Sequence, residues 1–152
     1  MTHLELIDAL GVKLGLDQLA FDENQTCRLI FANEIVVDME WDQEDHTLLV
    51  YTALGPEPEA ASPFYREMMI ANLFGAGTED AVLAVHSELQ EVILFRSFPG
   101  ELLEIDPFFD QLLKLLDRVD YWSKRLADCA FEQQEKKDAE GIEAALRRGT
   151  PI

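Results

Sequence analysis

Hydrophobic and polar positions recur with two different periods along this chain, and each change of period predicts a new element. Near the N-terminus, apolar residues recur at near-helical spacing from Leu4 to Leu14. Thr2 and Glu5 match a capping box, in which two side chains satisfy the free backbone N–H groups of a first helical turn. The pattern predicts a short amphipathic helix that ends at Gly15.

Alternation with a period of two residues follows in three consecutive runs, at 27–31, 35–41 and 46–55. Successive side chains of a strand point to opposite faces of a sheet, so this period indicates strands. The connections between the runs are short and polar. We therefore expect three strands in a meander.

A second helix is expected after the turn-rich linker GPEPEAASP. Ser62 followed by Pro63 is the pairing of cap and first helical residue that favours a helix start. The apolar side chains at helical spacing in the following run are Phe64, Met68, Met69 and Leu73. The helix is expected to end at the stretch NLFGAG, which contains Gly75 and Gly77.

The two glycines raise the possibility of a phosphate-binding loop, but their position argues against it. Such loops follow a strand and place the anion at the N-terminus of a helix. Here a helix precedes Gly75 and Gly77 and a strand follows them, so the glycines lie at the negative end of a helix dipole. They predict a helix cap, and we expect no nucleotide to bind there.

Two further strands, AVLAVH and EVILFRSF, form a second hairpin, and a long third helix follows. Asp106 and Pro107 repeat the signal for a helix start, and apolar residues recur at helical spacing as far as Leu126. The predicted fold class is α+β, with a helix, three strands, a helix, two strands and a helix around a twisted, mainly antiparallel sheet. We expect one domain over residues 1–131 and a polar tail, partly helical or disordered, over 132–152.

Composition narrows the classes of partner. The 152 residues suffice for one domain with a core, and 48% are hydrophobic, as in globular proteins. The formal net charge is −18, which would repel nucleic acids and anionic membrane surfaces. A basic or amphipathic polypeptide is a more suitable partner. An equally good alternative is that the acidity only keeps a soluble protein apart from its neighbours.

Residue types that carry chemistry are scarce and badly spaced. His3, His46 and His86 share no spacing that suits a metal ion, and no serine sits in a nucleophile elbow. Cys27 and Cys129 fit small apolar residues better than a disulfide or a metal site. We expect no catalytic site, cofactor or metal. The N-terminus has no signal region and no apolar run has transmembrane length, which predicts a reducing cytoplasm.

Apolar surface is what the sequence offers in place of chemistry. The first three strands carry apolar residues on both faces, more than one covering layer requires. The residues expected to bind a partner, on the first helix and these strands, are Leu4, Leu29, Phe31, Ile35, Val37, Leu49 and Tyr51. The apolar face of the second helix (Phe64, Met68, Met69 and Leu73) is expected to form a homodimer interface.

The order of elements resembles the class I type III secretion chaperones, the Tir-chaperone or CesT-like family. The resemblance covers Thr2 to Ala127. Its most specific pieces are FDENQTCRLIF after the first helix, ANLFGAG with the following AVLAV, and the pair Tyr121 and Trp122 in the last helix. Small size and strong acidity also agree.

The resemblance implies a homodimer without catalysis or nucleotide, in the cytoplasm of a Gram-negative bacterium. It implies that each dimer holds the unfolded N-terminal segment of a secreted effector and keeps it soluble and competent for export. The secretion ATPase is a further candidate partner. A regulatory binding module of the same fold, which sequesters a transcription factor or another secretion component, is the alternative, and sequence does not separate the two. A small-molecule enzyme would need a convergent polar pocket that the sequence does not indicate.

Overall fold

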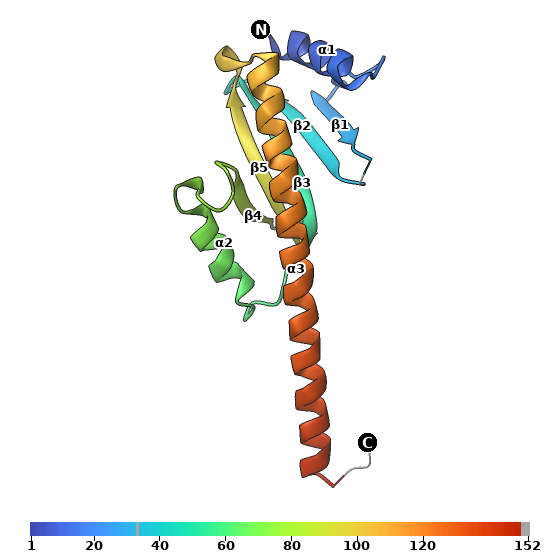
Figure 1. Cartoon of the computed structure of the whole chain (residues 1–152), viewed down its shortest axis with the longest axis vertical. Helices are drawn as coiled ribbons and strands as arrows, with labels where there is room; N and C mark the ends of the chain where they lie inside the picture. The colour runs from blue at the N-terminus through green and yellow to red at the C-terminus, as the bar shows by residue number, and fades with distance from the viewer. Residues whose placement is uncertain (33, 150–152) are drawn as a thin grey trace.

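The computed structural model describes residues 1–32 and 34–149 (Figure 1). In chain order its helices and strands are α1 (His3–Leu14), β1 (Thr26–Ile30), β2 (Val36–Asp42), β3 (Thr47–Pro56), α2 (Phe64–Asn72), β4 (Val82–His86), β5 (Glu91–Pro99) and α3 (Ile105–Arg147). Short 3₁₀ turns, Leu73–Gly75 and Gly100–Leu102, follow α2 and β5. The predicted order of elements is confirmed.

The five strands form one sheet in the order β1-β2-β3-β5-β4, and every neighbouring pair is antiparallel. The meander β1-β2-β3 and the hairpin β4-β5 were both expected from alternation. The sequence pattern did not give the order in which they join. Strand β5 pairs with β3, so β1 and β4 become the edges of the sheet.

The helices cover one face of this sheet. In Figure 1, α3 runs along the sheet, α1 crosses one end and α2 lies beside β4. Alternate strand residues point into the resulting core and are almost fully buried, as at Val37, Leu48 and Leu94. The core side chains that the helices contribute include Leu6, Leu10, Phe64, Met68, Phe108, Leu112 and Trp122. No helix lies over the opposite face within the described residues.

The predicted helix starts are close to those observed. Thr2 caps α1 with the expected capping box. The Ser62 hydroxyl accepts a hydrogen bond from the Phe64 N–H at 3.2 Å, although α2 begins one residue later than expected. The cap predicted at Asp106 is wrong, because α3 begins at Ile105 and its cap position is Glu104. Pro107 fits inside the first turn, where N–H groups have no helical partner.

The end of α2 bears out the predicted role of the glycines only in part, because α2 ends at Asn72, its cap residue is Leu73, and the 3₁₀ turn Leu73–Gly75 follows. Gly75 has φ +68°, the left-handed conformation that favours glycine at a helix end. Gly77 has ordinary φ, but a Cβ there would lie 2.9 Å from atoms of Ala71. The Asn72 side chain exchanges two hydrogen bonds with the backbone of Leu83, at 2.8 and 2.9 Å, and so joins the end of α2 to β4.

The long helix α3 continues without a break past Phe131, the end of the predicted domain. Its C-terminal part projects beyond the sheet (Figure 1). An ion pair joins Lys137 in this part to Glu59 in the linker. Residues 150–152 of the predicted tail lie outside the described residues. The division of the chain at residue 131 remains a prediction.

Candidate binding face of the sheet

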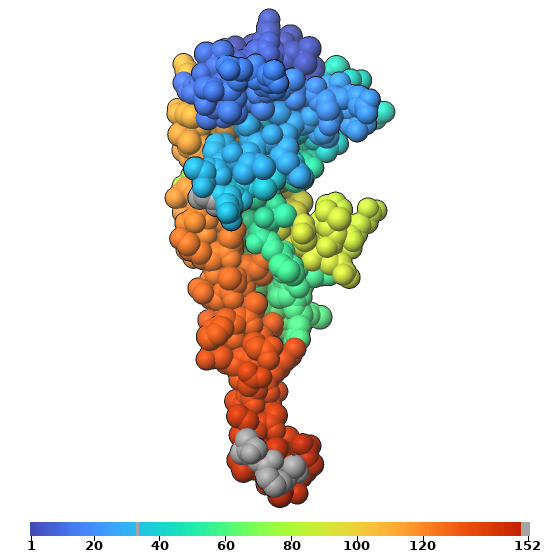
Figure 2. Space-filling model, turned by 90° about the vertical axis from the view of Figure 1, so that its right-hand side faces the viewer, coloured from blue at the N-terminus to red at the C-terminus, as the bar shows by residue number. Residues whose placement is uncertain are grey.

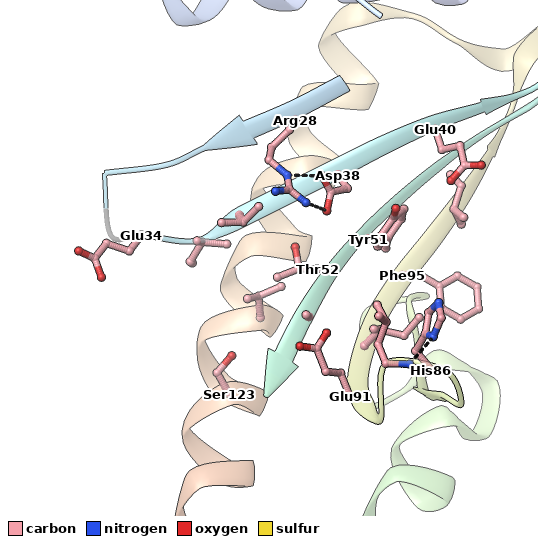
Figure 3. Close-up of a pocket in the computed structure, with 17 residues that line it drawn as sticks. Arg28, Glu34, Asp38, Glu40, Tyr51, Thr52, His86, Glu91, Phe95 and Ser123 are labelled. Atoms are coloured by element: carbon pink, nitrogen blue, oxygen red, sulfur yellow. Dashed lines mark hydrogen bonds and ion pairs between the residues drawn. The ribbon is translucent and has the colours of Figure 1, made fainter. Parts of the chain in front are cut away.

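The face of the sheet opposite the helices contains a hollow of about 730 Å³ (Figure 3). Its apolar lining comes mainly from β2, β3 and β5 and includes Ile35, Val36, Leu49, Tyr51, Ile93 and Phe95. Its charged lining consists of Arg28, Glu34, Asp38, Glu40 and Glu91. In the space-filling view of Figure 2 the outline is recessed between the β1-β2 region and the projecting β4-β5 hairpin.

Strand register explains why these side chains meet. Asp38 pairs with Tyr51, and Tyr51 pairs with Phe95, so the three lie in one row across β2, β3 and β5. Arg28 on β1 and Val82 on β4 extend the row to the two edges of the sheet. Residues in register share a face, and their side chains lie within contact distance. The row is therefore polar at the β1 edge and apolar toward β4.

The hollow reaches residues of α3 where β2 and β3 separate. Their pairing extends from Asp42 only to Asp38, whereas β3 continues from its partner residue Tyr51 to Pro56. Val119 and Ser123 of α3 line the hollow at this point, and Figure 3 shows α3 behind the gap. We call this gap, lined by Ile35, Thr52, Val119 and Ser123, the notch.

Thr52 is an unusual residue within the notch. It is only 3% exposed, and its hydroxyl oxygen has no hydrogen-bond partner among the described residues. A buried hydroxyl without a partner costs about 1–3 kcal/mol. Thr52 alternates with Tyr51 along β3 and is on the same, helix-covered side of the strand as Leu48 and Val50. Buried polar groups in native proteins are usually paired, so an unpaired hydroxyl next to the hollow is a position where a group of a bound ligand can supply the partner.

The charged side chains of the lining are of two kinds, an ion pair and carboxylates without a partner. The Arg28 guanidinium donates to both oxygens of Asp38, at 2.7 and 3.1 Å, which raises the pKa of Arg28. Glu34, Glu40 and Glu91 form no ion pair within the described residues. Partial burial raises the pKa of Tyr51, and the nearby Asp38 and Glu40 carboxylates raise it further. The hollow is thus a partly desolvated site with excess negative charge.

The structure distributes the residues predicted to bind a partner over two faces and an end of the sheet. Ile35, Leu49 and Tyr51 line the hollow together. Leu29 and Val37 are paired in register but point into the core at 4% and 0% exposure, so their assignment to an open surface is corrected. The two others lie elsewhere, Leu4 exposed on α1 and Phe31 packed partly against the core.

The residues predicted for the dimer interface are divided in the same way. Met69 and Leu73 are exposed. Phe64 and Met68 point toward the sheet and are buried in the core of the single chain, so their assignment to a free face is corrected. Other exposed apolar side chains of α2, β4 and the turns that follow them are Ile70, Phe74, Val82, Val85 and Leu89, and Leu89 also lines the hollow.

Sequence reasoning missed Val36, Ile93 and Phe95 as lining residues. Ile93 and Phe95 alternate with the buried Val92 and Leu94, so the second hairpin carries apolar residues on both faces, as the first three strands do. The same excess of apolar residues would have indicated them. The pairing of β3 with β5 is not apparent from a single sequence.

Other chemistry is sparse in the described part of the chain. Those residues contain no group of three or more metal-ligating side chains that could hold a metal ion. Both cysteines are buried, and burial raises the pKa of each thiol. Across residues 1–32 and 34–149, no helix combines the length and apolar character needed to cross a membrane.

Two solved structures show a similar fold. The chain superposes on the HopA1–SchA chaperone–effector complex with a TM-score of 0.68 at 21% identity, over 79% of this chain and 91% of the other. For the ExsC–ExsE complex the TM-score is 0.70 at 20% identity, over 83% and 97%. At these identities the likeness shows the fold.

Sequence comparison gives the family. The Tir chaperone of Escherichia coli is 27% identical over 94 residues, which are 62% of this chain, and the chain spans 60% of that relative's length. The Tir chaperone of Citrobacter freundii is 24% identical over the same shares. The model of the Tir chaperone protein (CesT) family matches residues 5–123. The chain therefore belongs to the Tir chaperone protein (CesT) family.

Proposed function

We propose that this protein is a type III secretion chaperone that binds the unfolded N-terminal segment of a secreted effector. The hollow on the uncovered face of the sheet is the observation that carries this proposal, because it combines apolar side chains with a separated pair of strands. The family and the chaperone–effector complexes among the structural neighbours support it.

An extended segment has two ways to bind this sheet. Backbone groups of an edge strand can accept an additional strand, and β1 is an edge where Ile30 is 71% exposed. Side chains of the segment can also enter the hollow beside Leu49, Tyr51 and Phe95. The segment loses conformational entropy when it binds, which reduces the net affinity and keeps release feasible.

We further propose a homodimer. The exposed apolar side chains of α2 and β4 lie next to one another because Asn72 joins these elements. Met69, Leu73 and Phe74 are exposed within six residues of one another, and apolar side chains exposed close together are typical of an interface. The hollow is centred on β2, β3 and β5, and it approaches the proposed dimer surface at Leu89 in the β4-β5 turn.

The proposal includes a cytoplasmic location in a Gram-negative bacterium and no catalytic activity. A chaperone of this kind acts by binding alone, so it needs neither cofactor nor metal. A regulatory module that sequesters a transcription factor or another secretion component would use the same hollow. The identity of the bound chain separates these two functions.

Co-purification from the native host, with identification of the bound chain by mass spectrometry, tests the function. A secreted effector, bound through its N-terminal segment, is the expected result. A transcription factor in its place would support the regulatory alternative. Hydrogen exchange with and without that chain then locates the site, and we expect protection in β2, β3 and β5. Protection confined to α3 would contradict the assignment of the hollow.

A further inference from the structure

The lining of the hollow also indicates the chemistry of the segment that binds there. This inference rests on the proposed function. We propose that the hollow takes a segment whose apolar side chains are flanked by Lys or Arg. The apolar side chains cover Tyr51 and Phe95, and the basic ones pair with Glu34, Glu40 and Glu91. A polar group of the segment reaches the Thr52 hydroxyl in the notch.

The apolar centre of the hollow sets the first requirement. Tyr51 and Phe95 lie opposite each other in register, and Leu49 and Ile93 lie on the same face, two residues away along β3 and β5. All four line the hollow and are only partly buried in the unbound chain. A bound apolar side chain removes the rest of their surface from water, which favours binding.

The margin of the hollow sets the second requirement. Figure 3 shows Glu34, Glu40 and Glu91 around the margin, with Tyr51 and Thr52 between them. Among the described residues that line the hollow, Arg28 is the one Lys or Arg, and it is already paired with Asp38. A segment that covers this surface partly desolvates three unpaired carboxylates, which is costly unless it brings cations to them.

The notch adds an independent indication of a ligand. The unpaired Thr52 oxygen is covered in the unbound chain, so a rotation of its χ1 or a slight further separation of β2 from β3 must bring it to the segment. The pairing of β2 with β3 ends at Tyr51, so the part of β3 after Tyr51 has no hydrogen bonds to β2. A further separation of the strands in this part therefore breaks none. A polar group of an entering backbone would then supply the partner that the hydroxyl lacks.

Charge also excludes the other occupants of this face. A second copy of the chain carries the same formal charge of −18 and so brings an excess of acidic groups to an acidic margin, whereas the proposed dimer contact uses exposed apolar side chains of α2. Nucleic acids and anionic lipid surfaces are disfavoured for the same reason. A small inorganic cation would leave the apolar centre uncovered. A basic, apolar polypeptide satisfies both the margin and the centre.

Three synthetic peptides of equal length test this inference. They share the same Leu, Val and Ser positions and carry Lys, Gln or Glu at all others, and fluorescence anisotropy measures their binding to the full chain. At about 50 mM salt the Lys peptide should bind roughly tenfold more tightly than the Gln peptide, and the difference should shrink at about 500 mM. The Glu peptide should bind most weakly.

Variants of the protein show whether the hollow causes this preference. The double variant Glu40→Gln with Glu91→Gln should weaken binding of the Lys peptide by roughly fivefold and leave the Gln peptide unchanged. The control, Glu135→Gln with Glu140→Gln on α3, removes the same charge far from the hollow and should have little effect. An equal loss in the control would attribute the preference to overall acidity and would overturn the inference.

A separate variant tests the role of the Thr52 hydroxyl in the notch. Thr52→Val keeps the shape and removes the unpaired hydroxyl, so it should raise the Tm of the unbound protein while it weakens binding of both the Lys and the Gln peptide. Unchanged affinity would show that the notch makes no polar contact. Equal affinity for the Lys and Gln peptides, or no binding of either, would refute the basic segment, whereas the proposed function is judged separately by the co-purified chain.

Discussion

Arg125 on α3 binds both carboxylate oxygens of Glu67 on α2. Its Nε donates to Oε2 at 2.9 Å and its Nη2 donates to Oε1 at 2.6 Å. The two side chains are 29% and 35% exposed, so water screens the pair only in part. The pair links the two helices beside the contact of Phe64 with Trp122, whose rings are 6.0 Å apart. It thereby holds the proposed dimer helix against the core.

This pair predicts a pH dependence of stability. The hydrogen bonds from Arg125 lower the pKa of Glu67 below its ordinary value of 4.5. The stabilisation is therefore complete above pH 4.5 and is lost as the pH falls through the lower pKa of the folded state. Glu67→Gln should cost about 0.5–1 kcal/mol at pH 7 and should reduce the loss of stability on acidification. Urea unfolding at several pH values measures both effects.

The control for this prediction is Glu132→Gln. Glu132 also faces Arg125, but the distance from Nη1 to Oε1 is 3.6 Å. Its removal should change the free energy of unfolding less than Glu67→Gln does. Identical pH profiles for the wild type and Glu67→Gln would show that the pair contributes nothing.

Two glycines with nearly the same backbone conformation give a second prediction. Gly75 and Gly15 have φ of +68° and +70°, but a Cβ at Gly75 would lie 2.8 Å from Asp80, whereas a Cβ at Gly15 meets nothing within 4 Å. Gly15→Ala should therefore cost only the conformational penalty of about 1 kcal/mol, and Gly75→Ala should cost clearly more. Thermal unfolding of both variants measures the difference. Equal losses would contradict a close approach at Gly75.

The sequence predicted the elements better than the faces. Capping signals at Thr2 and Ser62 and the two hydrophobic periods located the helices and strands, because these signals are local. The choice of open face is not local. Leu29 and Leu49 look alike in alternating runs, yet Leu29 is in the core and Leu49 lines the hollow, since register and the helices above the sheet decide which face is covered.

The candidate site was predictable only in part for the same reason. Apolar residues on both faces of the first three strands indicated a binding surface, and three of the predicted residues, Ile35, Leu49 and Tyr51, line the hollow. Its other side comes from β5. Residues of β3 and β5 that pair in the sheet are far apart in the sequence, and Tyr51 and Phe95 are separated by more than 40 positions. The unpaired hydroxyl of Thr52 depends on the separation of β2 from β3 and has no signature in the sequence.

A third prediction concerns the oligomeric state. The wild type should be a dimer at micromolar concentration, and Met69→Glu should give a folded monomer because Met69 is 75% exposed beside the other apolar side chains of α2. Met68→Glu is the matched comparison. Met68 is 5% exposed, so a carboxylate there should destabilise the chain itself. Light scattering with circular dichroism separates the two outcomes, and a monomeric wild type would refute the proposed interface.

The last prediction concerns the part of α3 beyond the predicted domain. The family match ends at residue 123, and the last core residue of the helix is Cys129. Beyond Phe131 the side chains are almost all exposed, and the pair of Lys137 with Glu59 is solvent-exposed, which limits its worth to about 1 kcal/mol or less. A chain that ends at Phe131 should therefore keep its fold and its Tm within a few degrees, while its helical circular dichroism falls. It should also retain binding at the hollow, because none of the residues that the structure describes after Phe131 lines it. A large fall in Tm would show that the projecting helix belongs to the domain, and loss of binding with an unchanged Tm would place part of the partner's site on it.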